Sequence, residues 1–571
     1  MRPQVDAGRY PVKRALGDEV RVEADVFTDG HDAVGCELLW RFSSESEWHV
    51  EPMQFLQNDH WAASFRVEKL GRYQYTVRGW TDAYLTWQRD LEKRKAAGQD
   101  IAVDLQIGAE LEGRPLDKLT YERTLEVLVD PVRARFSAWY EMFPRSFGGL
   151  KGMVEMLPYV ESLGFDILYL PPVHPIGTTA RKGKNNAVSA KPGDTGSPWA
   201  IGGKAGGHKA IEPSLGTFAD FDLLVKTANQ RKIEIALDIA FQCSPDHPYV
   251  KEHPEWFRKR PDGTIQYAEN PPKKYQDIYP FDFECENWRE LWSELKSIFE
   301  FWVGHGVKVF RVDNPHTKAF GFWEWCITEL KKSHPELVFL SEAFTRPRVM
   351  HKLAKLGFTQ SYTYFTWRNT KYELTEYFTE LSQDPSREYF RPNCWPNTPD
   401  ILHATLQHGG RPAFIVRAVL AATLAANWGI YGPAYELQER APREPGSEEF
   451  LDSEKYELKR WDLKRSDSLA PLVSRLNQVR RENPALQSDW SLQFHAIDND
   501  QLLAFSKKER DNEILVVVNL DPHHPRSGWL DFPPCKVHDL LSGGHYTWGS
   551  GRNYVELSPH TLPAHVFKVT R

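Results

Sequence analysis

The chain has 571 residues, of which 41% are hydrophobic and 26% are charged, and its net charge at pH 7 is −7. This composition is typical of a soluble globular protein of two to four domains. The negative charge gives no electrostatic case for binding nucleic acid or an anionic membrane. No run approaches eighteen apolar residues and no apolar leader follows Met1, so we expect no membrane span and no secretion signal.

Six cysteines are scattered along the chain, and none has the CxxC or Cys/His spacing of a metal site. We therefore expect reduced thiols in a cytoplasmic protein. These residues are Cys36, Cys243, Cys285, Cys326, Cys394 and Cys535.

Residues 1–130 are predicted to form a β-sandwich. Val20, Val22 and Val26 occupy alternating positions, and four tryptophans lie in runs that turns separate. Aromatic residues fill sandwich cores but also stack on sugars, so a packing module and a carbohydrate-binding module both remain open. A charged helical insert interrupts the strand pattern near residues 84–120.

From residue 136 onward, strand and helix patterns alternate, which predicts a (β/α)8 barrel over residues 131–485. A polar stretch at 173–212 is too long for a structureless loop, so we expect a lid subdomain there. Strands return after 486, and residues 486–571 are predicted to be a C-terminal β-domain. Predicted helices cover 150–163, 218–230, 320–332, 371–381, 413–424 and 469–481, and predicted strands cover 167–170, 233–237, 337–342, 361–366 and 428–431.

Two apolar runs of this barrel end on carboxylates. The first leads through Arg311 to Asp313, and the second ends at Glu342. One helix lies between them, so both acids come to the same rim, at the carboxyl ends of parallel strands. An aspartate after a strand is also common as a turn or cap residue, but a third acid, Asp400, follows Asn-Thr-Pro. Three carboxylates above an arginine suit oxocarbenium chemistry.

A compact group of hydrogen-bond donors lies in a second long excursion, residues 248–287. Asn270, Lys273 and Tyr275 flank a Pro-Pro pair there. Several donors at one place suit a phosphate, which offers several acceptor oxygens. The alternative interpretation of Lys273 and Lys274 is a solvated pair of loop charges.

Several runs resemble a known family. FRVD (310–313), SEA (341–343) and NTPD (397–400) resemble the second, third and fourth conserved regions of the α-amylase superfamily, glycoside hydrolase family 13. Longer runs, at 268–277, 313–318 and 361–370, are similar to the α-1,4-glucan:maltose-1-phosphate maltosyltransferases within that superfamily. The resemblance extends from about Trp139 to the C-terminus, with a weaker match before it.

The resemblance implies retaining transfer of a maltosyl unit from α-maltose-1-phosphate to the 4-hydroxyl of an α-1,4-glucan acceptor. Asp313 would be the nucleophile and Glu342 the acid/base. Asp400 would hold sugar hydroxyls, and Arg311 would keep Asp313 ionised. The implied phosphate contacts are Asn270, Lys273, Tyr275 and Asn314. The implied contacts to the maltosyl unit are Lys182, Ser197, Gln242, Asp277, Lys455 and Tyr456, although Lys182 and Ser197 could instead be solvated.

Two departures from the family pattern matter. Gln242 and Cys243 stand where amylases usually carry an asparagine that binds structural calcium and a histidine that contacts sugar, so we expect no metal, no cofactor and a re-lined pocket. The insert near 84–120 is shorter than the helical segment that helps to build a dimer in the family, which leaves a homodimer open.

Two other functions stay open: an α-amylase-type hydrolase and a non-catalytic amylase-like protein. A hydrolase has no use for a phosphate cradle. Non-catalytic relatives lose the catalytic acids, and this chain keeps all three.

Overall fold

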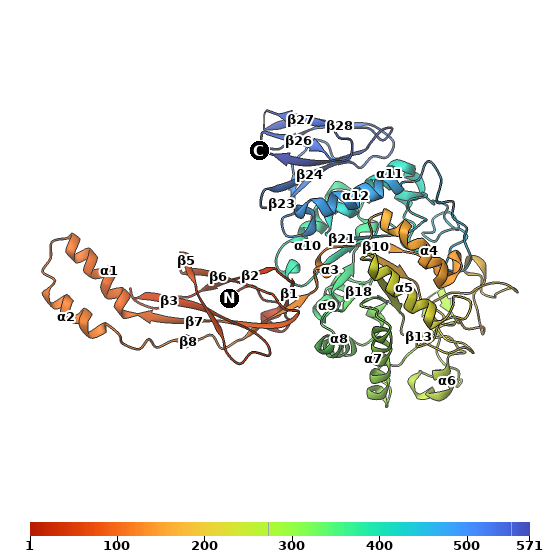
Figure 1. Cartoon of the computed structure of the whole chain (residues 1–571), viewed down its shortest axis with the longest axis horizontal. Coiled ribbons are helices and arrows are strands. Elements are labelled where there is room, and N and C mark those ends of the chain that lie inside the picture. Colours follow the sequence, from red (N-terminus) through yellow and green to blue (C-terminus); the bar gives the residue numbers. More distant parts are fainter. Residues whose placement is uncertain (272, 550) are drawn as a thin grey trace. The chain divides into compact units, whose positions relative to one another are not determined.

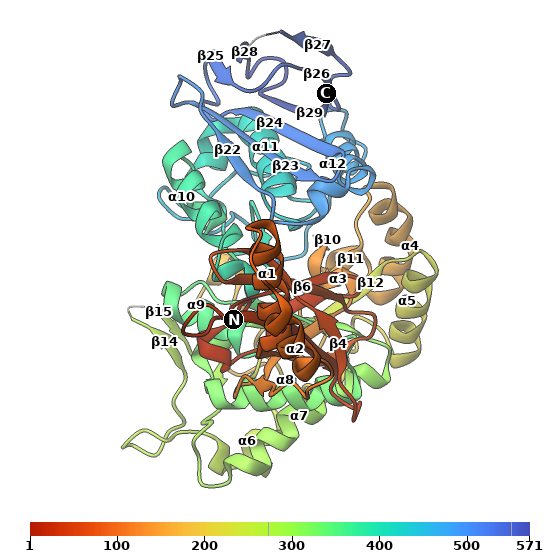
Figure 2. The same ribbon diagram turned by 90° about the vertical axis from the view of Figure 1, so that its left-hand side faces the viewer.

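The computed structural model describes residues 1–571 apart from Pro272, Ser550 and the side chain of Lys273. The chain forms two compact units, Met1–Val132 and Arg133–Arg571 (Figures 1 and 2). The first unit is mainly β-structure, and the second contains a closed barrel followed by further strands.

The first unit is built from two β-sheets that share a core. One sheet has the order β1-β9-β7-β3-β4 with β8 beside β7, and the other has the order β2-β6-β5. Trp40 of β3 stacks on Phe65 of β6 with 4.9 Å between ring centroids, so the predicted sandwich is confirmed. The strands are β1 (Val12–Ala15), β2 (Glu19–Asp25), β3 (Ala33–Phe42), β4 (His49–Pro52), β5 (Gln54–Gln57), β6 (His60–Arg66), β7 (Gly71–Asp82), β8 (Leu119–Thr120) and β9 (Leu125–Asp130).

A helical hairpin follows β7. The Asp82 carboxylate caps α1 (Ala83–Ala96) by accepting a bond of 2.8 Å from the Leu85 amide. In α2 (Ala102–Leu111), Gly108 lies against the ring of Trp87, where a Cβ would meet a ring carbon at 2.0 Å. The Trp87 indole donates to the Asp104 carbonyl at 2.6 Å. The two helices are therefore packed together by side chains rather than tethered loosely.

The second unit opens with a closed barrel of eight parallel strands, which confirms the predicted (β/α)8 architecture. Apolar side chains such as Trp139, Tyr169 and Leu340 fill its interior. Its strands are β10 (Ser137–Glu141), β11 (Ile167–Leu170), β12 (Glu234–Ile239), β17 (Val309–Asp313), β18 (Val338–Glu342), β19 (Gln360–Tyr362), β20 (Pro392–Cys394) and β21 (Asn427–Tyr431).

Helices alternate with these strands in the chain. They are α3 (Val132–Arg135), α4 (Gly149–Ser162), α5 (Phe218–Gln230), α6 (Pro248–Glu252), α7 (Trp288–Gly304), α8 (Phe320–Ser333), α9 (Pro347–Lys355), α10 (Lys371–Ser382), α11 (Ala404–Leu424) and α12 (Ala470–Glu482). Helices α3, α6, α7 and α9 and strand β20 have no counterpart among the predicted elements. Strand β19 stops at Tyr362, and 365–367 form a 3-10 turn instead of continuing the strand expected there.

Two long excursions leave the barrel after its second and third strands. Within 173–212 the described structure is irregular, although an isolated bridge joins Ile176 to Ile201. In the second excursion, β13 (Gln242–Cys243) pairs with β16 (Tyr279–Pro280), and β14 (Ala268–Asn270) pairs with β15 (Lys273–Tyr275) as a hairpin. Both excursions bring side chains to one cavity.

The C-terminal strands form a six-stranded sheet of order β22-β23-β24-β29-β26-β27 and a ribbon of β25 and β28. Side chains from both sheets, including Leu530 and Val555 of the ribbon, share one buried core. The strands are β22 (Gln493–His495), β23 (Leu502–Glu509), β24 (Asn512–Asn519), β25 (Arg526–Asp531), β26 (Cys535–Asp539), β27 (His545–Trp548), β28 (Arg552–Leu557) and β29 (Ala564–Thr570).

All six cysteines are free thiols and buried. Among the described residues, no helix combines the length and apolar character that crossing a membrane requires.

Candidate active site

A cavity of about 1430 Å³ opens where the barrel strands end. Of the fourteen residues that the sequence predicts for the site, twelve line this cavity. Arg311 lies beneath it, and the side chain of Lys273 is outside the described residues. The twelve are Lys182, Ser197, Gln242, Asn270, Tyr275, Asp277, Asp313, Asn314, Glu342, Asp400, Lys455 and Tyr456.

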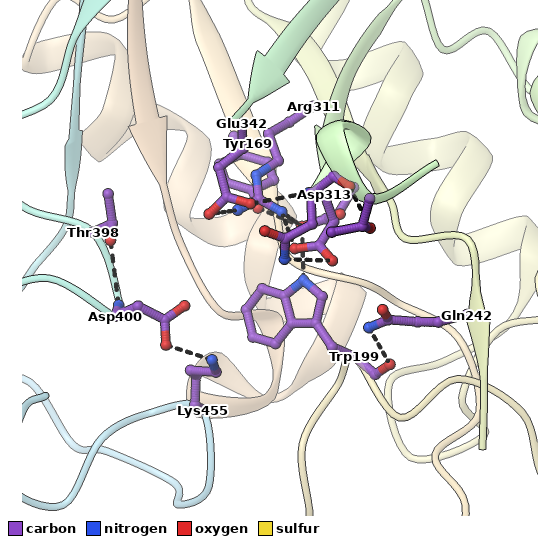
Figure 3. Close-up of polar contacts among 12 residues, drawn as sticks. Tyr169, Trp199, Gln242, Arg311, Asp313, Glu342, Thr398, Asp400 and Lys455 are labelled. Atoms are coloured by element: carbon purple, nitrogen blue, oxygen red, sulfur yellow. Dashed lines mark hydrogen bonds and ion pairs between the residues drawn. The ribbon is translucent and has the colours of Figure 1, made fainter. Parts of the chain in front are cut away.

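Asp313 and Glu342 are direct partners in the register of neighbouring parallel strands, because β17 and β18 end together. Arg311 lies two residues before Asp313, so its side chain is on the same face of β17. Its guanidinium contacts Asp313 Oδ1 at 2.9 Å and Glu342 Oε1 at 2.7 Å (Figure 3). The two acids are therefore held side by side by one cation at the floor of the cavity.

Asp238, which was not among the predicted site residues, is a third carboxylate on the same guanidinium. Arg311 Nη1 lies 2.9 Å from Asp238 Oδ2, which also accepts bonds from the Tyr169 hydroxyl at 2.5 Å and the Trp199 indole at 3.1 Å. Burial raises the pKa of Asp238 to about 6. A strand-end aspartate on β12 is the same sequence feature that identified Asp313, so the sequence did hold a signal for it.

The two central acids differ in pKa although they share a cation. Burial tends to raise the pKa of Asp313, but the charges of Arg311 and Lys318 outweigh it and hold that pKa below its ordinary value. Burial raises the pKa of Glu342 to about 8, and the negative charges of Asp313 and Asp400 add to the increase. At neutral pH the pair thus contains one ionised carboxylate and one protonated acid.

Asn314 sits directly after Asp313 in a left-handed conformation with φ of 41°. Its backbone N–H donates to Glu342 Oε2 at 3.2 Å, and its side-chain amide donates to Asp313 Oδ2 at 3.4 Å. Asparagine tolerates this backbone region better than most residues because its short side chain can bond locally. The turn therefore binds both acids of the pair.

Lys318 is a second cation at this turn and was not predicted as a site residue. Its ammonium donates to the Asn314 carbonyl at 3.2 Å and to the Thr317 hydroxyl at 3.0 Å, and it lines the cavity. Burial lowers the pKa of Lys318. Lys318 closes the 313–318 run that resembles the family, so the sequence held a signal for it.

The third predicted acid, Asp400, belongs to a separate group. It forms an ion pair with Lys455, whose ammonium lies 5.0 Å from the ring centroid of Trp199. Figure 3 shows this pair to one side of the group around Arg311. The Asp400 side chain is 45% exposed, against 8% for Asp313. Although burial acts to lower it, the pKa of Lys455 is raised by the adjacent Asp400 carboxylate.

The remaining predicted sugar contacts form the cavity wall. The Lys182 ammonium donates to the Lys274 carbonyl at 3.3 Å, and the Gln242 amide donates to the Trp199 carbonyl at 3.2 Å. Buried Asp277 has one carboxylate oxygen, Oδ1, that accepts no hydrogen bond from the described residues. A ligand hydroxyl is the kind of donor that such an orphaned acceptor lacks. Ser197 and Tyr456 are buried beside these groups.

The predicted phosphate contacts come from two places. Asn270 and Tyr275 lie on the β14–β15 hairpin, and Asn314 lies at the strand end. All three line the cavity, and Lys318 joins them. The backbone of Lys273 belongs to β15.

Within the described part of the chain, one cluster has metal-ligating side chains close together: His208, Cys243 and His247, with ligand atoms within 4.8 Å. The Tyr249 amide donates to His247 Nδ1 at 3.1 Å, so the proton of His247 is on Nε2, 3.0 Å from His208 Nδ1. His208 Nε2 in turn lies 2.9 Å from the Ala240 carbonyl. Both nitrogens of each ring are therefore used in a hydrogen-bonded chain, which does not fit a metal ion held by this pair.

Three family models match the chain. Domain N/S of α-1,4-glucan:maltose-1-phosphate maltosyltransferase matches residues 1–142. The catalytic domain of α-amylase matches residues 132–292, and the model described as GLGE, C-terminal, matches residues 494–569.

Curated relatives match almost the whole chain. The α-1,4-glucan:maltose-1-phosphate maltosyltransferase of Chlorobaculum tepidum is 50% identical over 638 residues, covering 99% of this chain and 95% of that protein. The proteins of that name from Salinibacter ruber and Picrophilus torridus are 48% and 42% identical, over 99% of this chain in each case and 95% and 98% of their own lengths. The first alignment is longer than this 571-residue chain, so that relative carries segments that this chain lacks.

Solved structures show the same fold at much lower identity. An α-amylase from Lactobacillus plantarum has a TM-score of 0.61 at 19% identity, covering 77% of this chain and all of that one. A cyclomaltodextrinase has a TM-score of 0.61 at 14% identity, covering 98% of each chain.

Proposed function

The chain belongs to the α-1,4-glucan:maltose-1-phosphate maltosyltransferases, and from this premise we propose how its residues carry out that transfer. A maltosyl unit leaves α-maltose-1-phosphate, is held on the enzyme and passes to the non-reducing 4-hydroxyl of an α-1,4-glucan. Inorganic phosphate is released, and the α configuration is retained because two displacements occur.

The register pairing of Asp313 with Glu342 is the observation that carries this mechanism. Neighbouring strands lie about 4.8 Å apart. Retaining glycosidases hold their two carboxyl groups about 5–5.5 Å apart, whereas inverting enzymes leave about 6.5–9.5 Å for a water molecule. Partners at the ends of adjacent strands, whose carboxylates both contact the Arg311 guanidinium, therefore suit the retaining separation better than the inverting one.

In the first step the ionised carboxylate of Asp313 attacks the anomeric carbon, and protonated Glu342 gives its proton to the departing phosphate oxygen. The lowered pKa of Asp313 and the raised pKa of Glu342 supply these two protonation states together at neutral pH. Arg311 contacts both acids, so it fixes their positions and stabilises the charge on Asp313.

In the second step Glu342 acts as the base for the incoming 4-hydroxyl. Once Asp313 is esterified, its negative charge is gone, and the pKa of Glu342 falls because that charge had helped to raise it. Glu342 thus becomes a carboxylate when a base is required. The same residue serves both half-reactions because its partner changes charge between them.

Recognition of the donor phosphate is assigned to Asn270, Lys273, Tyr275 and Asn314, to which we add Lys318. The support is that Asn270, Tyr275, Asn314 and Lys318 line one cavity next to the nucleophile. Amide, hydroxyl and ammonium donors suit a dianionic phosphate. The maltosyl unit is assigned to Asp400 and Lys455, with Lys182, Ser197, Gln242, Asp277 and Tyr456 along the wall.

Phosphate release from α-maltose-1-phosphate, with and without glycogen, tests this function. We expect release that depends on glycogen and a lengthened glucan product. Glucan hydrolysis with no phosphate release would instead identify an α-amylase-type hydrolase, and no turnover of either substrate would identify a non-catalytic protein.

We also propose that the chain forms a cytoplasmic homodimer through its helical hairpin. Val103, Leu105 and Ile107 of α2 are 67%, 50% and 44% exposed, and such apolar groups are typical of an interface. Light scattering after size-exclusion chromatography should give twice the 66.0 kDa of one chain. Leu105→Glu should be a monomer. A monomeric wild type would contradict the proposal.

A further inference from the structure

Two large aromatic side chains face solvent together on the C-terminal ribbon. Trp529 of β25 and Tyr554 of β28 are partners in the antiparallel register, with ring centroids 5.6 Å apart. Their exposed fractions are 47% and 52%. In the part of the chain that the structure describes, this is the only contact between two exposed Trp, Tyr or Phe rings.

The buried core of the ribbon does not include these rings. Along β25 and β28 the side chains alternate, and Leu530 and Val555 are buried in the core shared with the six-stranded sheet. Trp529 and Tyr554 occupy the opposite face. The ribbon is therefore already anchored by its inner face, and the outer rings add nothing to that core.

The outer face is also held in place. The Trp529 amide donates to Asp498 Oδ1 at 2.6 Å, and Arg552 joins Asp498 at 2.9 Å. The ammonium of Lys371, on barrel helix α10, donates to the Ile497 carbonyl at 2.8 Å. These bonds fix the loop behind Trp529, so its ring is presented on a rigid support rather than on a mobile tip.

Polar groups surround the two rings. Asp531 lies 3.4 Å from Arg552, and the Tyr554 hydroxyl donates to Glu556 at 2.9 Å. Two rings within a charged surface are too small for a stable protein interface, which buries about 800 Å² on each partner. Sugars fit better, because their apolar ring faces stack on aromatics while their hydroxyls bond to surrounding charged groups.

We propose that Trp529 and Tyr554 form a surface binding site for α-1,4-glucan, separate from the catalytic cavity. Neither ring lines that cavity as the described residues define it. The rings are inclined at 64° to one another, which suits the curved course of an α-1,4-linked chain better than a flat chain. Resting on the proposed function, the site would hold a polymeric acceptor while its non-reducing end enters the cavity.

Affinity electrophoresis in gels containing glycogen tests the site, with phosphate release as a second readout. The variants are Trp529→Ala, Tyr554→Ala and the double variant. Tyr372→Ala is the matched control, because Tyr372 is 73% exposed on α10 and lies outside the ribbon. We expect the dissociation constant for glycogen to rise by about tenfold in the double variant, which corresponds to a loss of about 1.4 kcal/mol for the two ring contacts together.

Acceptor length distinguishes a surface site from a change in the cavity. The KM for glycogen should rise in the double variant, while kcat/KM with maltotetraose, which is short enough to use the cavity alone, should not change. Glycogen retention equal to that of Tyr372→Ala would overturn the site, and so would an equal loss with maltotetraose. If the wild type releases no phosphate at all, the proposed function fails, and the gel measurement still decides this site.

Discussion

The floor and the rim of the cavity are built differently. At the floor, Asp238, Asp313 and Glu342 come from three barrel strands and all contact Arg311. At the rim, Asp400 comes from a loop and forms its ion pair with Lys455, which is on another loop. The floor supplies a buried acid pair that suits glycosyl transfer in general. The loops around the rim also carry the β14–β15 hairpin, to which we assign part of the recognition of the donor phosphate.

The largest loss of activity is expected from a substitution at the floor of the cavity. Asp313→Asn keeps the shape of the side chain but removes the nucleophile, so we expect turnover of maltose-1-phosphate to fall by about four orders of magnitude or more. Asp313 is buried and bonded to Arg311, so the conservative amide is preferable to alanine. Phosphate release together with a thermal melt checks this. A variant of unchanged melting temperature and near-wild-type rate would exclude Asp313 as the nucleophile.

A smaller and selective effect is expected from substitutions on the β14–β15 hairpin at the rim of the cavity. Loss of one charge-assisted bond to phosphate costs about 1.5–3 kcal/mol. Asn270→Ala and Lys273→Ala should therefore each lower kcat/KM for maltose-1-phosphate by roughly ten- to a hundredfold. Competitive inhibition by plain maltose should hardly change, because maltose carries no phosphate. Lys274→Ala is the matched control, since Lys274 is exposed and does not line the cavity. Equal losses for both ligands would indicate a structural role.

A pH profile tests the assignment of Glu342 as the acid of the first step. Because the pKa of Glu342 is raised to about 8, kcat/KM for the donor should fall as pH rises through 8, when the acid loses its proton. Protonated Glu342 binds its proton more tightly in the folded state than in the unfolded chain, where its pKa is 4.5. The stabilisation that this proton gives to the folded state is therefore fully present below pH 4.5 and is lost as the pH rises towards 8. Glu342→Gln should accordingly lose less melting temperature than wild type between pH 5 and pH 9. If the melting temperatures of the wild type and of Glu342→Gln change equally with pH, the raised pKa of Glu342 is contradicted.

Removal of metal ions is expected to have no effect. With Gln242 and Cys243 in place of the usual amylase pair, and with His208 and His247 bonded to each other, EDTA should change neither activity nor melting temperature. A fall of several degrees that calcium restores would show that the cavity wall depends on a metal.

The sequence allowed the barrel and its acids to be predicted because periodicity and strand ends are local. Asp313 and Glu342 each end an apolar run, and one helix separates the runs, so their meeting follows from parallel topology. Strand β20 could not be assigned, because three residues that begin with Pro392 have no period to detect. Helix α11 was predicted only beyond Pro412, and its earlier turn is interrupted at Gly410, where φ is 56°.

What the sequence could not give was pairing across long distances. The contact of Asp400 with Lys455 spans 55 residues, and the bond from Trp199 to Asp238 joins the 173–212 excursion to a barrel strand. Lys318 lies in the 313–318 run that resembles the family, but its bonds to the Asp313 and Asn314 carbonyls depend on how the turn at Asn314 folds. Such contacts depend on how irregular segments fold, and no spacing rule describes them.

Intact-mass spectrometry of Glu342→Ala incubated with maltose-1-phosphate shows directly whether Asp313 is the nucleophile and Glu342 the base of the second step. Phosphate leaves slowly without acid help, and the second step then lacks its base, so a maltosyl adduct on Asp313 should accumulate. The adduct should be absent with plain maltose and absent in the Asp313→Asn, Glu342→Ala double variant. If no adduct forms with maltose-1-phosphate under any condition, or if it forms without Asp313, the assignment of the floor pair is wrong.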